Sequence, residues 1–143
     1  MHKKMVYSNN KPNPAQVLYL GKYKRYDFFI LNLGTHPTAY VRIPRTHPFF
    51  GKDYDYCSPP HGFEGGPFTF SNSSANFANF LDTPIPGGWY LGWDYAHIND
   101  WLGYLSDEQN IQMGNHKHTT EEMILDCKNV IEYLLEVKNE PRK

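Results

Sequence analysis

Two neighbouring apolar runs, residues 27–33 and 38–43, limit what this chain can fold into more than any other feature. The first run, Asp-Phe-Phe-Ile-Leu-Asn-Leu, is apolar on both faces and rich in aromatic and branched side chains, which is typical of a central strand. In the second run, small or branched apolar residues alternate with more polar ones. The turn residues Gly34-Thr35-His36-Pro37 lie between them, so the sequence predicts a hairpin.

Three shorter segments are expected to extend this hairpin into a sheet. Residues 16–20 form a short apolar run that predicts a first strand, and residues 68–71 predict another. Residues 89–95 predict the next strand, in which alternation places Trp89 and Trp93 on one face and Asp94 on the other. The connections between these strands are long and contain many Pro and Gly residues.

A C-terminal amphipathic helix is predicted over residues 119–140. Thr119-Thr120-Glu121-Glu122 has the form of a capping box, and Pro141 follows the last turn. One face of this helix carries Met123, Cys127, Val130, Ile131 and Leu134. The predicted fold class is therefore α+β: a small, mostly antiparallel sheet with long connections and a C-terminal helix packed on one face.

Length and composition favour one domain over residues 1–143, with residues 1–15 as an irregular lead-in. The formal net charge is −1 and no dense basic stripe is present, which argues against binding to duplex nucleic acid. No apolar run approaches the length of a membrane span or a signal peptide, so we expect no membrane partner and a cytoplasmic location. The two cysteines indicate thiols rather than a scaffold of disulfides.

The connection over residues 44–67 is long for a compact domain, and connections of this length are commonly functional. It contains four candidate ligand-binding residues, which are His47, Lys52, Asp53 and Asp55. The two carboxylates can ligate a hard cation or share a proton. Alternate carboxylates in a loop are, however, more often solvated or involved in capping turns.

A glycine-rich stretch runs from the end of this connection into the strand predicted at residues 68–71. Its candidate ligand-binding residues are His61, Gly65, Gly66, Thr69 and Ser71. Glycines allow a close backbone approach and leave amides free to face an anion. The stretch lacks the Gly-Lys-Ser/Thr ending of a nucleotide P-loop, and tight turns explain the glycines equally well.

The end of the strand at residues 89–95 is the most informative segment. Asp94 lies opposite the apolar face, His97 follows just beyond the strand, and Trp93 is included as an aromatic ligand contact. A carboxylate and an imidazole placed together can bind a ligand, act as a general base and its partner, or hold a metal. Alternatively, Asp94 caps the following turn and His97 donates to a carbonyl.

The sequence requires no cofactor, although a divalent metal is compatible with it. Neither cysteine belongs to a Cys/His quartet with the spacing of a structural zinc site. His116-Lys117-His118 offers a chelating pair, which we expect to be exposed on a polar loop before the last helix. Cys127 falls on the apolar helix face, where a buried thiol is inert.

Several of these motifs occur together in a recognisable order. The motifs are, in order, His47-Pro48-Phe49-Phe50-Gly51-Lys52-Asp53-Tyr54-Asp55, Gly65-Gly66-Pro67-Phe68-Thr69-Phe70-Ser71, the segment from Gly88 to His97 with Trp89, Gly92, Asp94 and Ala96, and Asp100. Together they resemble a family of small uncharacterised bacteriophage and prophage proteins. The resemblance covers roughly residues 40–100. It implies a phage origin and an accessory role in the infected cell, such as host-defence antagonism, with the host cytoplasm as its location.

These observations lead to three functional hypotheses. The first is a protein that binds and sequesters a phosphorylated or nucleotide-like ligand. A homo-oligomer is compatible with this hypothesis, because it would cover apolar surface of a small sheet protein. The second is a hydrolase of a phosphodiester or glycosidic bond, with His97 as general base, Asp94 orienting it, and His47 or His61 as acid or metal ligand. The third is an inhibitor that blocks a host protein by surface contact.

Overall fold

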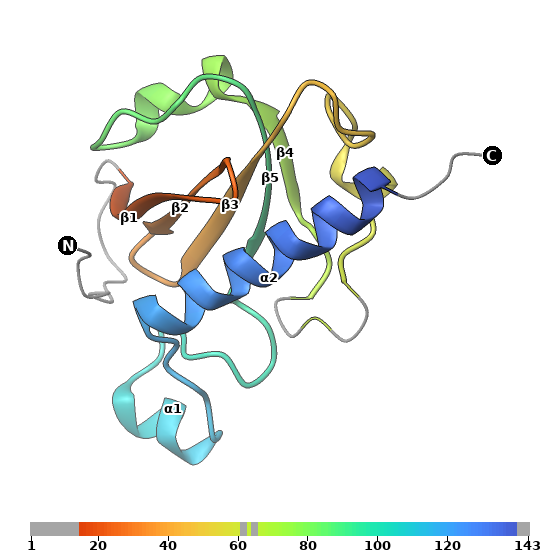
Figure 1. Cartoon of the computed structure of the whole chain (residues 1–143). Coiled ribbons are helices and arrows are strands. Elements are labelled where there is room, and N and C mark those ends of the chain that lie inside the picture. The colour runs from red at the N-terminus through yellow and green to blue at the C-terminus, as the bar shows by residue number, and fades with distance from the viewer. Residues whose placement is uncertain (1–14, 61–62, 64–65, 140–143) are drawn as a thin grey trace.

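A five-stranded antiparallel sheet forms the centre of the computed structural model, which describes residues 15–60, 63 and 66–139 (Figure 1). The strands are β1 (Gln16–Tyr23), β2 (Tyr26–Asn32), β3 (Pro37–Ile43), β4 (Phe70–Ser73) and β5 (Trp89–Asp94). Their order in the sheet is β1-β2-β3-β5-β4. The helix α2 (Thr120–Asn139) packs on the sheet, which confirms the predicted α+β class.

The hairpin at the centre of the prediction is present. Phe28 pairs with Val41 and Asn32 with Pro37, so β2 and β3 are joined by the predicted turn. β1 continues to Tyr23, beyond the predicted run, because it forms a second hairpin with β2 through a two-residue turn at Lys24 and Arg25. Both turn residues have positive φ, 47° and 73°, and neither is the glycine or asparagine that would have signalled the turn.

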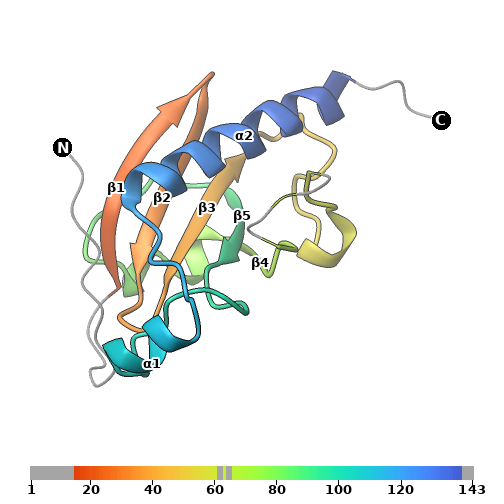
Figure 2. The ribbon, with the colours of Figure 1, turned by 90° about the horizontal axis from the view of Figure 1, so that it is seen from below.

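α2 covers one face of the sheet, as Figure 2 shows. All five residues of its predicted apolar face are buried, and they join Leu91, Trp93 and other residues of the sheet in the main core. The predicted capping box is also present: the Glu122 amide donates to Thr119 Oγ1 and the Thr119 amide donates to Glu122 Oε1, both at 3.1 Å. Residue 140, the predicted last residue of the helix, lies outside the described part.

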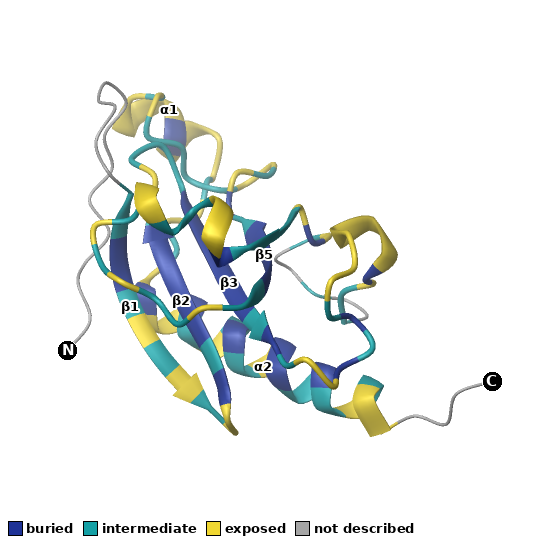
Figure 3. Cartoon of the chain, turned by 90° about the horizontal axis from the view of Figure 1, so that it is seen from above, coloured by how far each residue is buried: buried dark blue, intermediate teal, exposed yellow. Residues whose placement is uncertain are grey.

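The connection after β4 covers the opposite face of the sheet (Figure 3). It contains two short 3-10 helices, η2 (Ser74–Asn76) and η3 (Ala78–Phe80), with Phe77 between them. The Phe77 ring lies 5.1 Å from that of Phe70 and 5.7 Å from that of Tyr90, and it packs against a second, largely aromatic core. The sheet is therefore covered on both faces.

A short helix between β5 and α2 was not predicted. α1 (Asp107–Gln112) begins with a capping box formed by Ser106 and Gln109. The fully buried Asn110 holds the surrounding loop: its Nδ2 donates to the Leu102 carbonyl and its Oδ1 accepts from the Leu102 amide, both at 3.0 Å. Within the described residues, no helix has the length and apolar character needed to cross a membrane.

Candidate functional site

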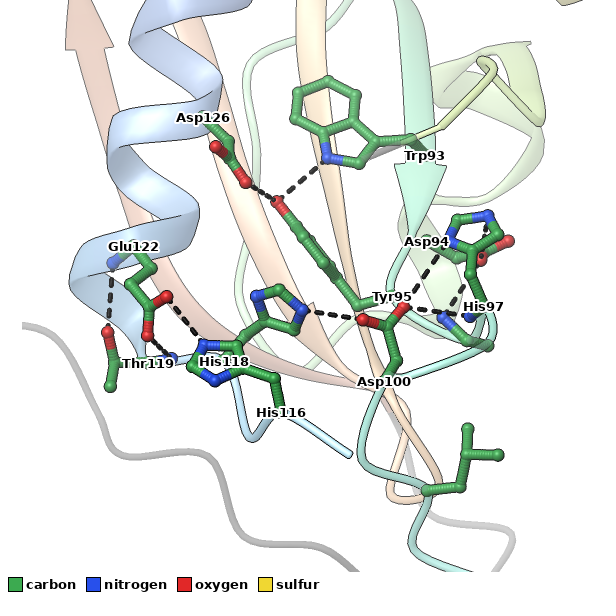
Figure 4. A network of polar contacts seen from close by, with 12 residues as sticks. Trp93, Asp94, Tyr95, His97, Asp100, His116, His118, Thr119, Glu122 and Asp126 are labelled. Carbon is green, nitrogen blue, oxygen red and sulfur yellow. Dashed lines mark hydrogen bonds and ion pairs between the residues drawn. The ribbon is translucent and has the colours of Figure 1, made fainter. Parts of the chain in front are cut away.

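A network of histidines and carboxylates lies where the end of β5 meets the start of α2 (Figure 4). The segment after β5 supplies Asp94, His97 and Asp100. The segment before α2 supplies two histidines, His116 and His118. A parallel bridge between Asp100 and His116 holds these segments together, reinforced by backbone hydrogen bonds on both sides of it.

Asp94 and His97 are brought together as the sequence predicted. The His97 Nε2 lies 3.5 Å from Asp94 Oδ1, and the side chain of His97 is 37% exposed. Asp94 Oδ1 also accepts from the Ala96 amide at 3.2 Å, so Asp94 caps the turn while it faces the imidazole. The two interpretations of Asp94 are therefore compatible.

Two residues of the glycine-rich stretch reach this pair. Thr69 Oγ1 donates to Asp94 Oδ2 at 3.3 Å. Gly66 has φ of +76°, and a Cβ at this position would lie 3.1 Å from the ring of His97. The absence of a side chain at residue 66 thus allows the backbone to pass directly over the imidazole.

Asp100 links His97 to His118. Its Oδ2 accepts from the His97 amide at 2.9 Å and lies 3.4 Å from His97 Nδ1, while its Oδ1 is 2.8 Å from His118 Nε2. Burial alone would raise the pKa of the Asp100 carboxyl, but the hydrogen bonds from His118 and the His97 amide hold it below its usual range. Burial likewise lowers the pKa of His118, but Asp100 and the nearby Glu122 and Asp126 carboxylates raise it overall.

Glu122 and His116 form the outer part of the network. Glu122 Oε2 lies 2.8 Å from His116 Nε2, and both side chains are about half exposed. Burial raises the pKa of Glu122, yet its hydrogen bonds with the Thr119 amide and with His116 lower it overall. One potential ligand atom from each of His116, His118 and Glu122 lies within 4.8 Å of the other two, which is a spacing that a metal ion can bridge.

Behind this network, Trp93 and Tyr95 lie in the core. Trp93 Nε1 donates to the Tyr95 hydroxyl at 3.0 Å, and that hydroxyl donates to Asp126 Oδ2 at 2.8 Å. Burial, followed by the neighbouring Cys127 and Asp126, raises the pKa of Tyr95 well above its ordinary value. Trp93 is only 1% exposed because alternation along β5 turns it toward α2, so its indole presents no surface to a ligand.

His47 lies away from this network, and it is buried and hydrogen-bonded to the backbone. It is 4% exposed; its Nε2 lies 2.8 Å from the Leu134 carbonyl, and its Nδ1 accepts from the Phe49 amide at 2.9 Å. Leu134 is about 21 Å along the axis of α2 from Thr120, at 1.5 Å per residue, and the histidine network lies at the Thr120 end. The structure therefore does not bring His47 together with Asp94 and His97.

Of the other candidates of the connection 44–67, Asp55 borders an open pocket of about 380 Å³. Its lining consists of Tyr54, Asp55, Cys57, Ser58, Pro59, Pro67, Phe68 and Thr69. The Tyr54 amide donates to Ser71 Oγ at 2.9 Å, which fixes the connection against β4. His61 and Gly65 lie outside the described residues, so their placement stays a prediction.

Lys52 and Asp53 directly precede the short 3-10 helix η1 (Tyr54–Tyr56). The Lys52 ammonium lies 5.3 Å from the centre of the Tyr56 ring, and both side chains are exposed. The Asp53 carbonyl accepts from the Tyr56 amide at 3.0 Å, so its backbone closes the turn while its side chain is exposed. The carboxylates of Asp53 and Asp55 thus remain at the surface near the pocket.

Sequence reasoning missed Asp100, His118 and Glu122 as members of one network. The His-x-His pair was visible, and Glu122 was assigned only its capping role. Their convergence depends on the bridge between Asp100 and His116, whose partners belong to two irregular segments and carry no hydropathy pattern. Periodicity cannot reveal such a contact.

Comparison with known proteins does not assign this site. No family model matches the chain, and neither the curated proteins nor the solved structures include a significant match.

Proposed function

We propose that this chain is a small binding protein that sequesters a nucleotide-like ligand in the pocket beside β4. The observation that carries the proposal is the position of Thr69, which lines the pocket and also donates to Asp94. Thr69 therefore links the pocket to the pair Asp94–His97. A pocket of about 380 Å³ is within the size range of small-molecule sites.

The lining suits the parts of a nucleoside. Tyr54 and the prolines give apolar walls on which a flat base can stack. Asp55 and Asp94 supply carboxylate oxygens that accept hydrogen bonds from ribose hydroxyls or exocyclic amines. These groups recognise the uncharged part of the ligand.

The charges near the pocket limit the phosphate content of the ligand. Lys52 provides an ammonium group and His97 an imidazole, whereas Asp53, Asp55 and Asp94 provide carboxylates. A carboxylate near a phosphate raises the free energy of the complex by like-charge repulsion. A ligand with one phosphate, or with a phosphodiester, therefore fits better than a nucleoside triphosphate. The resemblance to phage proteins is the reason to propose sequestration inside an infected cell as the role.

Thermal-shift and calorimetric titrations test this proposal. The panel contains nucleosides, nucleoside monophosphates and triphosphates, cyclic dinucleotides and ADP-ribose. We expect a shift with at least one monophosphate or phosphodiester and at least about tenfold weaker binding in Asp94→Asn, because a hydrogen bond to a charged group is worth roughly 1.5–3 kcal/mol. Asp107→Asn on α1 makes the same charge change away from the pocket and should bind as the wild type does. No shift with any panel member would overturn the proposal.

Hydrolysis is a second candidate, favoured by the position of His97 between two carboxylates. Its ring nitrogens lie 3.5 Å from Asp94 and 3.4 Å from Asp100, and the side chain is partly exposed. A carboxylate that orients an accessible imidazole is the arrangement of a general base. Recovery of the intact ligand after heat release would identify sequestration. Turnover that is lost in His97→Ala and retained in Asp107→Asn would identify an enzyme.

A further inference from the structure

We propose that His116, His118 and Glu122 form a binding site for a divalent transition metal ion of the zinc class. This site is separate from the ligand pocket, and the proposal does not depend on the proposed function. The three residues present one potential ligand atom each, all within 4.8 Å of one another. In a tetrahedral zinc site, ligand atoms at roughly 2.1 Å from the ion are about 3.4 Å apart. Small side-chain rotations can therefore bring all three onto one ion.

The carboxylate that would orient one of the metal ligands, His118, is already in place. His118 Nε2 is 2.8 Å from Asp100 Oδ1, which leaves Nδ1 as its metal-binding atom (Figure 4). A histidine that donates one ring N–H to a carboxylate and binds metal through the other nitrogen is a recurring arrangement in metal sites. Asp100 is itself held by the His97 amide, so the imidazole of His118 is oriented before any ion binds. The His118 side chain is only 16% exposed, which restricts its motion.

The other two ligands face each other across a short contact. His116 Nε2 and Glu122 Oε2 are 2.8 Å apart, and a metal ion bound by both atoms takes the place of the proton they share and releases it to solvent. Glu122 Oε1 accepts from the Thr119 amide, which fixes the carboxylate at the start of α2. The backbone of His116 is fixed as well, since its amide donates to the Asn99 carbonyl and its carbonyl accepts from the Trp101 amide.

The charges around the site favour a cation. Asp100 and Asp126 add negative charge near His118, beside the carboxylate of Glu122. Lys117, between the two histidines in sequence, places its ammonium 4.8 Å from the centre of the Trp101 ring. Its positive charge is thus partly balanced by an aromatic face.

The chemistry of the donors selects the class of ion. Two imidazoles and one carboxylate form the ligand set of zinc sites that keep one position open, whereas Ca²⁺ and Mg²⁺ prefer oxygen ligands. The side chains of His116 and Glu122 are 54% and 45% exposed, so a fourth position on the ion is accessible to water. We therefore expect Zn²⁺ and Co²⁺ to bind, and Ca²⁺ and Mg²⁺ not to compete.

Calorimetric titration of the full chain with Zn²⁺ and Co²⁺ tests the site, after removal of any histidine tag and dialysis against EDTA. We expect one equivalent to bind with submicromolar affinity, and bound Co²⁺ to show the intense visible absorption of tetrahedral coordination. Asp100→Asn should weaken binding by about 10–100-fold, the usual effect of losing the carboxylate that hydrogen-bonds to a ligating histidine. His116→Ala and Glu122→Gln should weaken it further, because they remove ligands.

Glu121→Gln is the matched control, because it removes the same charge from the same helical turn. It should bind as the wild type does, and all variants should show unchanged circular dichroism in EDTA. Failure of both ions to bind would overturn the proposal. It would also be overturned if Glu121→Gln weakened binding as much as Glu122→Gln, since the ion would then be attracted by the general negative charge of this region and not bound by Glu122. Equally tight Ca²⁺ binding would refute the class of ion.

Discussion

The cysteine that borders the pocket beside β4 shows how burial controls the chemistry of a single residue. Cys57 lines the pocket but is only 3% exposed, and its Sγ donates to the Asp53 carbonyl at 3.4 Å. Burial, with the neighbouring Asp55 and Asp53 carboxylates, raises the pKa of its thiol to about 11. Because the thiolate is the nucleophile, a thiol with this pKa is unsuited to covalent catalysis near neutral pH.

We therefore predict that the native chain reacts slowly with Ellman's reagent at mildly alkaline pH. Cys127 is fully buried on α2, and burial also raises its pKa well above the ordinary value, so neither thiol should titrate quickly. Both should react at once in denaturant. Rapid labelling of Cys57 in the folded chain would show that the pocket opens more widely than the structure indicates.

His47 is a second residue whose surroundings decide its role, although the sequence placed it among ligand-binding candidates. The sequence shows only a histidine in a polar, proline-containing connection. Its contact with the Leu134 carbonyl joins segments 87 positions apart, and no local pattern encodes such a pair. A buried histidine whose ring nitrogens are both hydrogen-bonded cannot be distinguished from an exposed histidine by residue type alone.

At the scale of elements, the connection 44–67 is fastened to α2 through His47. We predict that His47→Ala lowers the free energy of unfolding by about 2–4 kcal/mol, through lost packing and two lost hydrogen bonds. Urea denaturation measures this change. His116→Ala, which removes a half-exposed histidine, is the control and should change the stability by less than about 1 kcal/mol in EDTA. Equal effects would show that His47 does not anchor the connection.

The turn between β1 and β2 contains residues that are not the most stable choice for its backbone conformation. Arg25 is exposed and has a φ of +73°, a conformation that costs an L-residue about 1–2 kcal/mol and glycine little. We predict that Arg25→Gly raises the free energy of unfolding by about 0.5–1 kcal/mol in chemical denaturation. Lys24→Gly should not match this gain, because Lys24 forms an ion pair with Glu132 at 2.7 Å. Destabilisation by Arg25→Gly would mean that Arg25 has stabilising contacts that outweigh its strained backbone.

The elements that could be predicted are those with a strong hydropathy period or a local signature. β2, β3 and β5 alternate or are apolar throughout, and α2 has a capping box and a continuous apolar face. α1 was missed because most of its six residues are polar and it is held by the single buried Asn110. β4 was displaced by two residues from its prediction, since pairing with β5 rather than its own sequence sets its start.

At the scale of the whole molecule, the pair Asp100–His118 ties the segment after β5 to the start of α2 and makes the stability depend on pH. The pKa of Asp100 is lowered in the folded chain, so its contribution is present above about pH 4 and is lost as the pH falls. The pKa of His118 is raised, so its contribution is present below about pH 6.5 and is lost as the pH rises through the folded value. Both contributions are present between these limits.

We predict that the difference in unfolding free energy between the wild type and Asp100→Asn is largest near pH 5 and smaller at pH 8.5 and pH 3, in EDTA. Chemical denaturation at these pH values measures it. An NMR titration of the His118 ring should show a lower pKa in the variant, because the partner that raises it has been neutralised. If the difference in unfolding free energy did not change with pH, Asp100 and His118 would not form an ionic contact that contributes to stability.

Ile43 and Trp89 are register partners in adjacent strands, so the chain that leaves the end of β3 comes back beside the same point as the start of β5. Residues 44–88 between them include all of the pocket lining and β4. Because the ends of this excursion are held together by strands that pair directly, doubling its length would cost only about 0.6 kcal/mol in closure entropy. Insertions at exposed positions that border the pocket can thus change its shape while the fold is kept, whereas β4 and Phe77 tie the rest of this excursion to the sheet.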